Sequence, residues 1–243
     1  MEIFSVTFLL IGLILFTAAF NQGLTGFGFA LTSIPLISLV VGIKYAVPLG
    51  ALAGFVVNIL LSIQLRKSID FKSLRFLYIG SFIGIPIGVF VLSKADPDLF
   101  QRILGIVILL FVIMSATNFI KPRTMNLKWG YLFGLFSGML GGAFNTNGPP
   151  VLIYFYLTGK DKLEQKSAIT GFFIVASVLI IFTHAVTGLS NSTIFLDAVK
   201  FLPFIISGYL LGTFLFKKVS SQMYSKLILF FLFVISVTLI IYG

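Results

Sequence analysis

Two polar stretches interrupt an otherwise apolar chain, and their residue types suit the binding of an anion. Residues 20–28 read Phe-Asn-Gln-Gly-Leu-Thr-Gly-Phe-Gly, and residues 141–150 read Gly-Gly-Ala-Phe-Asn-Thr-Asn-Gly-Pro-Pro. Glycine and proline interrupt helices, while Asn, Gln and Thr offer neutral hydrogen-bond donors. A helix that begins directly after such a break presents unpaired N–H groups and a partial positive charge to a ligand.

The candidate binding residues come from these stretches and from one later helix. Asn147, followed by Pro149 and Pro150, has the pattern of a helix N-cap, and Thr25 holds the corresponding place in the first stretch. Asn58 lies on a helix face of small residues. The alternative is that the breaks are packing hinges and that Asn58 bonds a neighbouring helix. The predicted substrate-binding residues are Gln22, Thr25, Gly26, Asn58, Asn145, Thr146, Asn147 and Gly148.

His184 is the one histidine of the chain and is expected near the outer end of its helix. An imidazole titrates near neutral pH, so His184 is a candidate for proton coupling; the alternative is an interfacial position without a function. With Ser137 it would form the dyad of an intramembrane serine protease, which is a remote alternative. One histidine and no cysteine make neither a metal site nor a haem ligand pair, so we expect no metal, no cofactor and no enzymatic activity.

Composition places the chain in a lipid bilayer. Of its 243 residues, 58% are hydrophobic and 10% are charged. A soluble fold cannot hide that much apolar surface, whereas a bilayer solvates it. No Asp, Glu, Lys or Arg lies well inside an apolar segment, although proton pumps and cation antiporters usually keep a carboxylate there. This composition favours an anion that is held by dipoles and amides.

The formal net charge of +10 does not indicate nucleic-acid binding, because the basic residues fall in short loops. They gather in residues 66–75, 121–128, 160–166 and 217–226. The positive-inside rule assigns such loops to the cytoplasm. We therefore expect a multi-pass protein of the cytoplasmic (inner) membrane with both chain ends outside.

The apolar segments fall into two sets of five that follow the same order of short and long. Gly26 and Gly148 differ by 122 positions, and Gly84 and Gly208 differ by 124, which implies a duplicated chain with a small insertion. The expected halves are residues 1–120 and 121–243, within one membrane domain. The segments are residues 3–20, 29–41, 45–65, 74–92 and 102–119, then 129–144, 150–157, 167–186, 195–216 and 224–242.

The fold class that this pattern predicts is an all-α polytopic membrane protein with two inverted-topology repeats. Each repeat is expected to contain two short, glycine-broken helices followed by three spanning helices. An odd number of crossings per half inverts the second half relative to the first. The first two segments of each half either cross fully or form a re-entrant hairpin. Residues 150–157 are too short to cross at about 1.5 Å per residue, which favours the hairpin.

Three motifs resemble the TauE/SafE sulfite exporter family, also called the toluene-sulfonate uptake permease family. They are residues 23–29, 46–48 and 141–150, and the resemblance covers essentially the whole chain. It implies a small inner-membrane transporter with an internal repeat and with sulfite, a sulfonate or a related organic anion as its substrate. Where family members often carry glycine near the second motif, this chain has Asn145 and Asn147, a difference that bears on the substrate.

Together these features predict a secondary transporter that moves small organic or inorganic oxyanions (sulfonate, sulfite or carboxylate) across the membrane by alternating access. Its expected partners are the small anion and the lipid bilayer, with no nucleic acid. Coupling to H⁺ and assembly into a homo-oligomer are left open. A passive anion channel that uses the same helix dipoles is the alternative.

Overall fold

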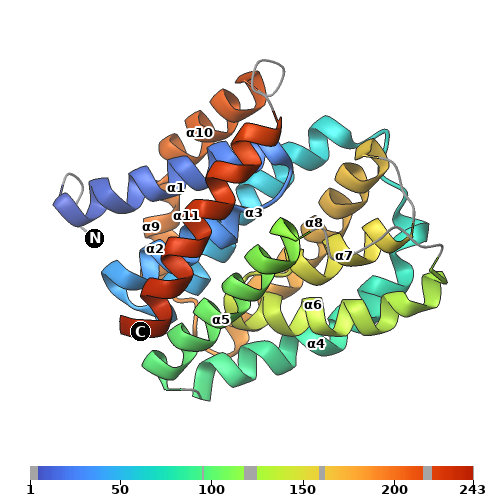
Figure 1. The fold of residues 1–243 in the computed structure, drawn as a ribbon. Coiled ribbons are helices and arrows are strands. Elements are labelled where there is room, and N and C mark those ends of the chain that lie inside the picture. The colour runs from blue at the N-terminus through green and yellow to red at the C-terminus, as the bar shows by residue number, and fades with distance from the viewer. Residues whose placement is uncertain (1–4, 95, 118–124, 159–161, 216–220, 243) are drawn as a thin grey trace.

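The computed structural model of this protein describes residues 5–94, 96–117, 125–158, 162–215 and 221–242. These residues form α-helices and two short 3-10 helices, with no strand among them, which confirms the all-α class (Figure 1). In chain order they are α1 (Val6–Thr25), α2 (Phe29–Val41), α3 (Ile43–Leu65), η1 (Phe71–Leu74), α4 (Arg75–Lys94), α5 (Pro97–Ala116), η2 (Leu127–Trp129), α6 (Gly130–Phe144), α7 (Gly148–Leu157), α8 (Lys162–Val186), α9 (Ser192–Lys200), α10 (Leu202–Leu215) and α11 (Ser221–Tyr242).

Several helices are long and apolar enough to cross a membrane, which agrees with a polytopic membrane protein. Within the described residues, five helical stretches meet this criterion of length and composition: α1, α3, η1 with α4, α5 and α8. The pair α9 and α10 would make a sixth span, bent by 49°. Parts of the predicted basic loops lie outside the described residues, namely Lys121, Arg123, Lys160, Lys217 and Lys218.

The first helix is longer than the sequence pattern predicts. α1 continues through the polar residues to Thr25, because Asn21 donates to the Thr32 hydroxyl (2.9 Å) and Thr25 donates to the Asn21 carbonyl (2.9 Å). The break therefore falls at Gly26, whose φ of 88° ends the helix. With 20 residues, α1 is long enough to span, so the prediction of two short helices at the start of each half is wrong for the first half. It holds for α6 and α7, with 15 and 10 residues.

The predicted single segment 195–216 is in fact two helices. α9 begins earlier, at Ser192, where the Asn191 side chain accepts the Ile194 N–H (3.0 Å). The chain bends at Phe201, two residues before Pro203. Pro203 has no N–H to donate to the carbonyl four residues before it, so the hydrogen-bond ladder of α9 cannot continue regularly past this point.

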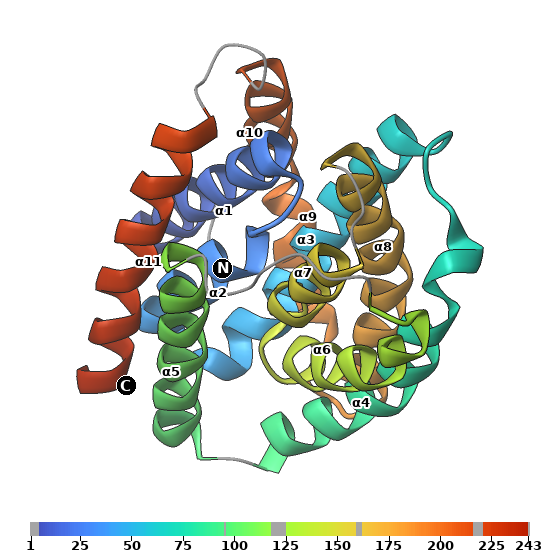
Figure 2. The same ribbon diagram turned by 45° about the vertical axis from the view of Figure 1, so that its right-hand side comes forward.

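Two helix pairs pack backbone against backbone. α1 lies along α10, and α4 lies along α6 (Figures 1 and 2). A methyl group added at Gly84 would collide with the Leu135 carbonyl oxygen, and one added at Gly208 would collide with that of Phe16. Such contacts are typical of helices that associate in membranes through small residues. α5 packs on α11, and α3 contacts α8 as well as α2 and α9.

We predict that Gly84→Val separates α4 from α6 and destabilises the protein. The added side chain meets backbone atoms of α6, which cannot move aside as a flexible side chain can. The expected loss is roughly 1–3 kcal/mol, as for overpacked cores, measured as a lower melting temperature of the purified protein. Ile83→Val on the exposed face of the same helix is the matched control and should leave the melting temperature unchanged. Equal melting temperatures for both variants would contradict the packing role.

Candidate functional site

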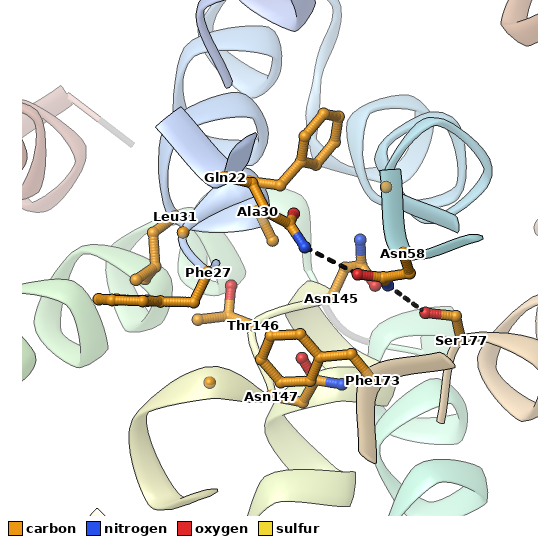
Figure 3. Close-up of a pocket in the computed structure, with 14 residues that line it drawn as sticks. Gln22, Phe27, Ala30, Leu31, Asn58, Asn145, Thr146, Asn147, Phe173 and Ser177 are labelled. Atoms are coloured by element: carbon orange, nitrogen blue, oxygen red, sulfur yellow. Dashed lines mark hydrogen bonds between the residues drawn. The ribbon is translucent and has the colours of Figure 1, made fainter. Parts of the chain in front are cut away.

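Both helix breaks line one small polar cavity (Figure 3). The cavity has a volume of about 30 Å³, which is room for only about two water molecules. Among the described residues its walls come from α1, α2, α3, α7 and α8 and from the two breaks. The lining residues are Gln22, Phe27, Gly28, Phe29, Ala30, Leu31, Gly54, Asn58, Asn145, Thr146, Asn147, Gly148, Phe173 and Ser177.

At the first break, the N-terminal end of α2 points toward this cavity. Gly26 and Gly28 have φ values of 88° and 93°, a left-handed backbone that suits glycine. No side chain caps α2, and its first internal hydrogen bond runs from the Thr32 N–H to the Gly28 carbonyl (3.2 Å). The N–H groups of residues 29–31 therefore have no partner within their own helix. Ala30 and Leu31 both line the cavity, so the positive end of α2 faces it.

The second break is held by hydrogen bonds to its own half of the chain. Asn145 ends α6 with a φ of 53° and donates its N–H to the Gly141 carbonyl (2.8 Å). The Ser137 hydroxyl donates to the Asn147 carbonyl (2.6 Å). α7 begins at Gly148, directly after Asn147, which is the place predicted for a capping residue. Because two prolines follow, the Gly148 N–H is the first backbone donor of α7.

A chain of buried amides and a hydroxyl joins three helices across the cavity. Gln22 Nε2 on α1 donates to Asn58 Oδ1 on α3 (2.7 Å), and Asn58 Nδ2 donates to Ser177 Oγ on α8 (2.8 Å), as Figure 3 shows. The Asn58 amide thus bonds neighbouring helices, which is the alternative to substrate binding that the sequence left open. Ser177 was absent from the predicted site, because a serine on an apolar helix gives no signal of its partner.

Most of the predicted binding residues come together at the cavity. Those that line it are Gln22, Asn58, Asn145, Thr146, Asn147 and Gly148. Thr25 and Gly26 do not. Thr25 was expected to cap α2, but it is the last residue of α1, and its hydroxyl donates to the carbonyls of Asn21 and Phe27. Gly26 instead lies against the aliphatic chain of Lys166. The prediction of Thr25 as an N-cap is therefore wrong.

His184 is buried between helices, two residues before the end of α8. Its side chain is 0% exposed, and Nε2 lies 3.3 Å from the Gly142 carbonyl of α6. Nδ1 has no hydrogen-bond partner. The Ser137 hydroxyl points to a different carbonyl, that of Asn147, so these two residues do not form a nucleophile–base pair. In the described part of the chain, no three His, Cys, Asp or Glu residues gather into a metal site.

Asp197 is a buried carboxylate that the sequence pattern did not indicate. It lies on α9 and is 2% exposed. Its Oδ2 accepts the Tyr45 hydroxyl of α3 (2.6 Å), and its Oδ1 lies 3.0 Å from Lys200 Nζ. Buried carboxylates need such partners. In the sequence, Asp197 falls near the start of a predicted segment and close to Lys200, which is typical of a charged residue at the end of a loop. Its burial becomes visible only in the packing of α9 on α3.

Comparisons with known proteins agree on one family. The model of the family described as "Sulfite exporter TauE/SafE" matches residues 10–239. The chain is 28% identical over 153 residues to a protein of Cupriavidus necator named "Probable sulfite/organosulfonate exporter TauE". That match covers 60% of this chain and 59% of the relative, so the chain spans about three fifths of the curated relative's length. No solved structure matches the chain.

We predict that Asn58→Ala destabilises the protein, because it removes two interhelical hydrogen bonds and leaves Gln22 and Ser177 without this partner. The expected loss is about 1–3 kcal/mol, measured by thermal unfolding of the purified protein. Ser62→Ala is the matched control, one turn further along α3, because the Ser62 hydroxyl is buried without a partner. A loss as large for Ser62→Ala would show that the amide chain is not the cause.

Proposed function

Because the chain belongs to the sulfite exporter TauE/SafE family, we propose that it is a secondary transporter of small oxyanions across the cytoplasmic membrane. The candidate substrates are a sulfonate, sulfite or a carboxylate, moved by alternating access. The observation that carries this proposal is the meeting of two helix beginnings at one polar cavity. The name of the Cupriavidus necator relative, which mentions sulfite and organosulfonate, supports an oxygen-rich anion as the substrate class.

The chemistry of the cavity suits an anion that is bound without a full positive charge. None of its lining residues is Lys, Arg, Asp or Glu. The donors available are the first N–H groups of α2, the Gly148 N–H and the side-chain amides of Gln22, Asn145 and Asn147. Helix dipoles and amides attract an anion and still permit its release, which a transporter needs. The donors are unequal on the two sides, since α2 offers several backbone N–H groups, whereas the second break offers the Asn145 and Asn147 amides and α7 begins with one N–H before two prolines.

The size of the cavity supports a transport cycle with a change in shape. With room for only about two water molecules, the cavity is tight for the headgroup of a sulfonate or sulfite. We therefore propose that the breaks move apart when such an anion binds. We propose that α2 and α7, which join α1 and α6 through breaks of three residues each, separate during this step.

We further propose that residues 1–120 and 121–243 are two inverted-topology repeats. Gly208 packs on the Phe16 carbonyl of α1, and Gly84 packs on the Leu135 carbonyl of α6. Each contact joins the first helix of one half to the fourth segment of the other half. Phe16 and Leu135 lie 119 positions apart, and Gly84 and Gly208 lie 124 apart. The equivalent contacts in the two halves support a duplication.

The same spacing of 119 recurs at the site. Gly26 and Asn145, which both end a helix with a positive φ, lie 119 positions apart. Asn58 and Ser177 are separated by 119 and bond each other, as residues beside a two-fold axis do. The equivalent of Gly26 is therefore Asn145, and the register of 122 that pairs Gly26 with Gly148 is three positions too long. The insertion before the fourth segment then comprises five residues.

The orientation of the chain follows from its charges in this proposal. The loops around residues 66–75, 117–129, 158–166 and 216–220 carry the clustered basic residues. They would face the cytoplasm, with both chain ends outside.

Transport in proteoliposomes tests the proposed function. We expect uptake of a labelled sulfonate or sulfite to saturate, and a trapped unlabelled anion to drive counterflow of the labelled one. A passive anion channel conducts without counterflow, so unsaturable flux would support the channel instead. Lack of transport for every sulfonate, sulfite and short carboxylate would overturn the proposal.

We predict that anions which bind the cavity raise the melting temperature and that Asn147→Leu abolishes this shift. Stabilisation by a ligand at 100 times its Kd amounts to about 2.7 kcal/mol, so the shift is measurable in a panel of anions. Asn145→Gly should weaken it, since glycine keeps the left-handed backbone at this position and removes only the amide.

Thr238→Val on the exposed face of α11 is the matched control for these variants, because its hydroxyl bonds only the Val234 carbonyl of the same helix. It should keep the full shift. An unchanged shift in Asn147→Leu would clear this residue of any part in binding, and stabilisation by cations or neutral solutes alone would contradict an oxyanion site.

We propose H⁺ as the coupling ion, with His184 as its carrier. Its imidazole is enclosed against α6, and the buried Nδ1 has no hydrogen-bond partner. An imposed pH gradient should drive accumulation of the anion in the native protein. His184→Gln should lose that response and keep counterflow, since the binding cavity does not include His184. A pH response equal to that of the native protein would assign coupling elsewhere.

A further inference from the structure

A second cavity lies beside the first, at the ends of helices that border predicted cytoplasmic loops. It is open, mostly apolar and about 530 Å³ in volume. We call it the vestibule. It is lined by the last turns of α5, residues 133–140 of α6, the beginning of α7, one residue of the first turn of α8, and Phe27 of the first break. The lining residues are Phe27, Val107, Leu110, Phe111, Met114, Ser115, Phe133, Phe136, Leu140, Pro149, Pro150, Leu152, Ile153 and Gln165.

Among the described residues, Phe27 is the one that lines both the vestibule and the polar cavity. Next to it, the first turn of α7 divides the two spaces, since Gly148 lines the polar cavity and Pro149 lines the vestibule. In Figure 3 the Phe27 ring lies on the side of the cavity opposite Ser177. The wall between a large open space and the small polar one therefore contains one aromatic side chain.

The backbone of Phe27 is held by hydrogen bonds and is flanked by glycines that can rotate. Its N–H donates to the Thr25 hydroxyl (3.3 Å), and its carbonyl accepts the same hydroxyl (2.7 Å). On either side stand Gly26 and Gly28, both with positive φ. Glycines reach other backbone conformations without the steric cost of a side chain, so the two flanking residues can act as a hinge for the ring between them.

The equivalent position in the second break carries no such ring. At the spacing of 119, Phe27 corresponds to Thr146. Thr146 is 1% exposed, and its hydroxyl donates to the Phe144 carbonyl (3.0 Å). The aromatic wall is thus a feature of one break, on the side of the basic loops.

We propose that Phe27 is the gate between the vestibule and the polar cavity. In the described conformation its ring closes the passage, and a turn at Gly26 and Gly28 opens it. The gate is a further element of the proposed transport function and rests on it for its physiological meaning. The barrier itself is measurable without any substrate, so its test can fail independently of the proposed function.

The natural absence of cysteine makes a direct test possible. Ser177→Cys places a thiol in the polar cavity, and Ser115→Cys places one in the vestibule. Both full-length variants are reconstituted in lipid nanodiscs and exposed to a small water-soluble methanethiosulfonate reagent. We expect rapid labelling of Ser115→Cys and slow labelling of Ser177→Cys.

Adding Phe27→Ala should accelerate labelling of Ser177→Cys by about tenfold or more, because minor open states are commonly populated at roughly 0.1–10%. It should not change labelling of Ser115→Cys. Phe136→Ala is the matched control, since this ring lines the vestibule and not the polar cavity. Its addition should leave the rate of Ser177→Cys unchanged. If Phe27→Ala fails to fold, Phe27→Leu takes its place, and we expect a smaller acceleration of Ser177→Cys labelling.

Three outcomes would overturn the gate. Equal rates for Ser177→Cys with Phe27, with Phe27→Ala and with Phe27→Leu would show that the ring is no barrier. Equal acceleration by Phe136→Ala would show a general loosening of the helices. Failure of Ser115→Cys to react would show that water does not enter the vestibule. Anion binding that is absent while the gate result holds would instead refute the oxyanion proposal alone.

Discussion

The structure depends on satisfying backbone polar groups where neither water nor a regular helix can do so. A break inside an apolar helical protein exposes N–H and C=O groups that must find partners within the protein. At the second break the Ser137 hydroxyl bonds the Asn147 carbonyl, and at the first break Thr25 bonds both polar groups of the Phe27 backbone. Because both breaks lie at one cavity, their remaining backbone and side-chain donors lie close together there. The polar centre of the molecule is a consequence of this requirement.

Close helix packing supplies the frame in which the breaks can face each other. α10 holds α1, and α4 holds α6, through glycines whose replacement would bring side chains into the partner's backbone. These pairs fix the ends of α1 and α6, from which the breaks depart. α2 and α7 are shorter and are joined to that frame by only three residues each. The architecture therefore combines two tightly packed helix pairs with two short helices that begin at the breaks.

The sequence predicted those features that depend on local chemistry. Helix-breaking glycines and prolines located both breaks, and six of the eight predicted residues line the cavity. The sequence did not predict which groups the side chains hydrogen-bond. Thr25 resembles a cap, yet it ends α1, because its hydroxyl bonds the preceding turn. Asp197 resembles a loop charge until α9 packs on α3.

The contracted polar cavity has an energetic consequence for any ligand that enters it. An anion that needs more room than about two water molecules binds a wider conformation, and its apparent affinity is reduced to the extent that this conformation is rare. Part of the free energy gained when the donors bind the ion is therefore offset by the free energy needed to widen the cavity. Preorganising the wide form, without adding a single donor, would tighten binding and slow dissociation.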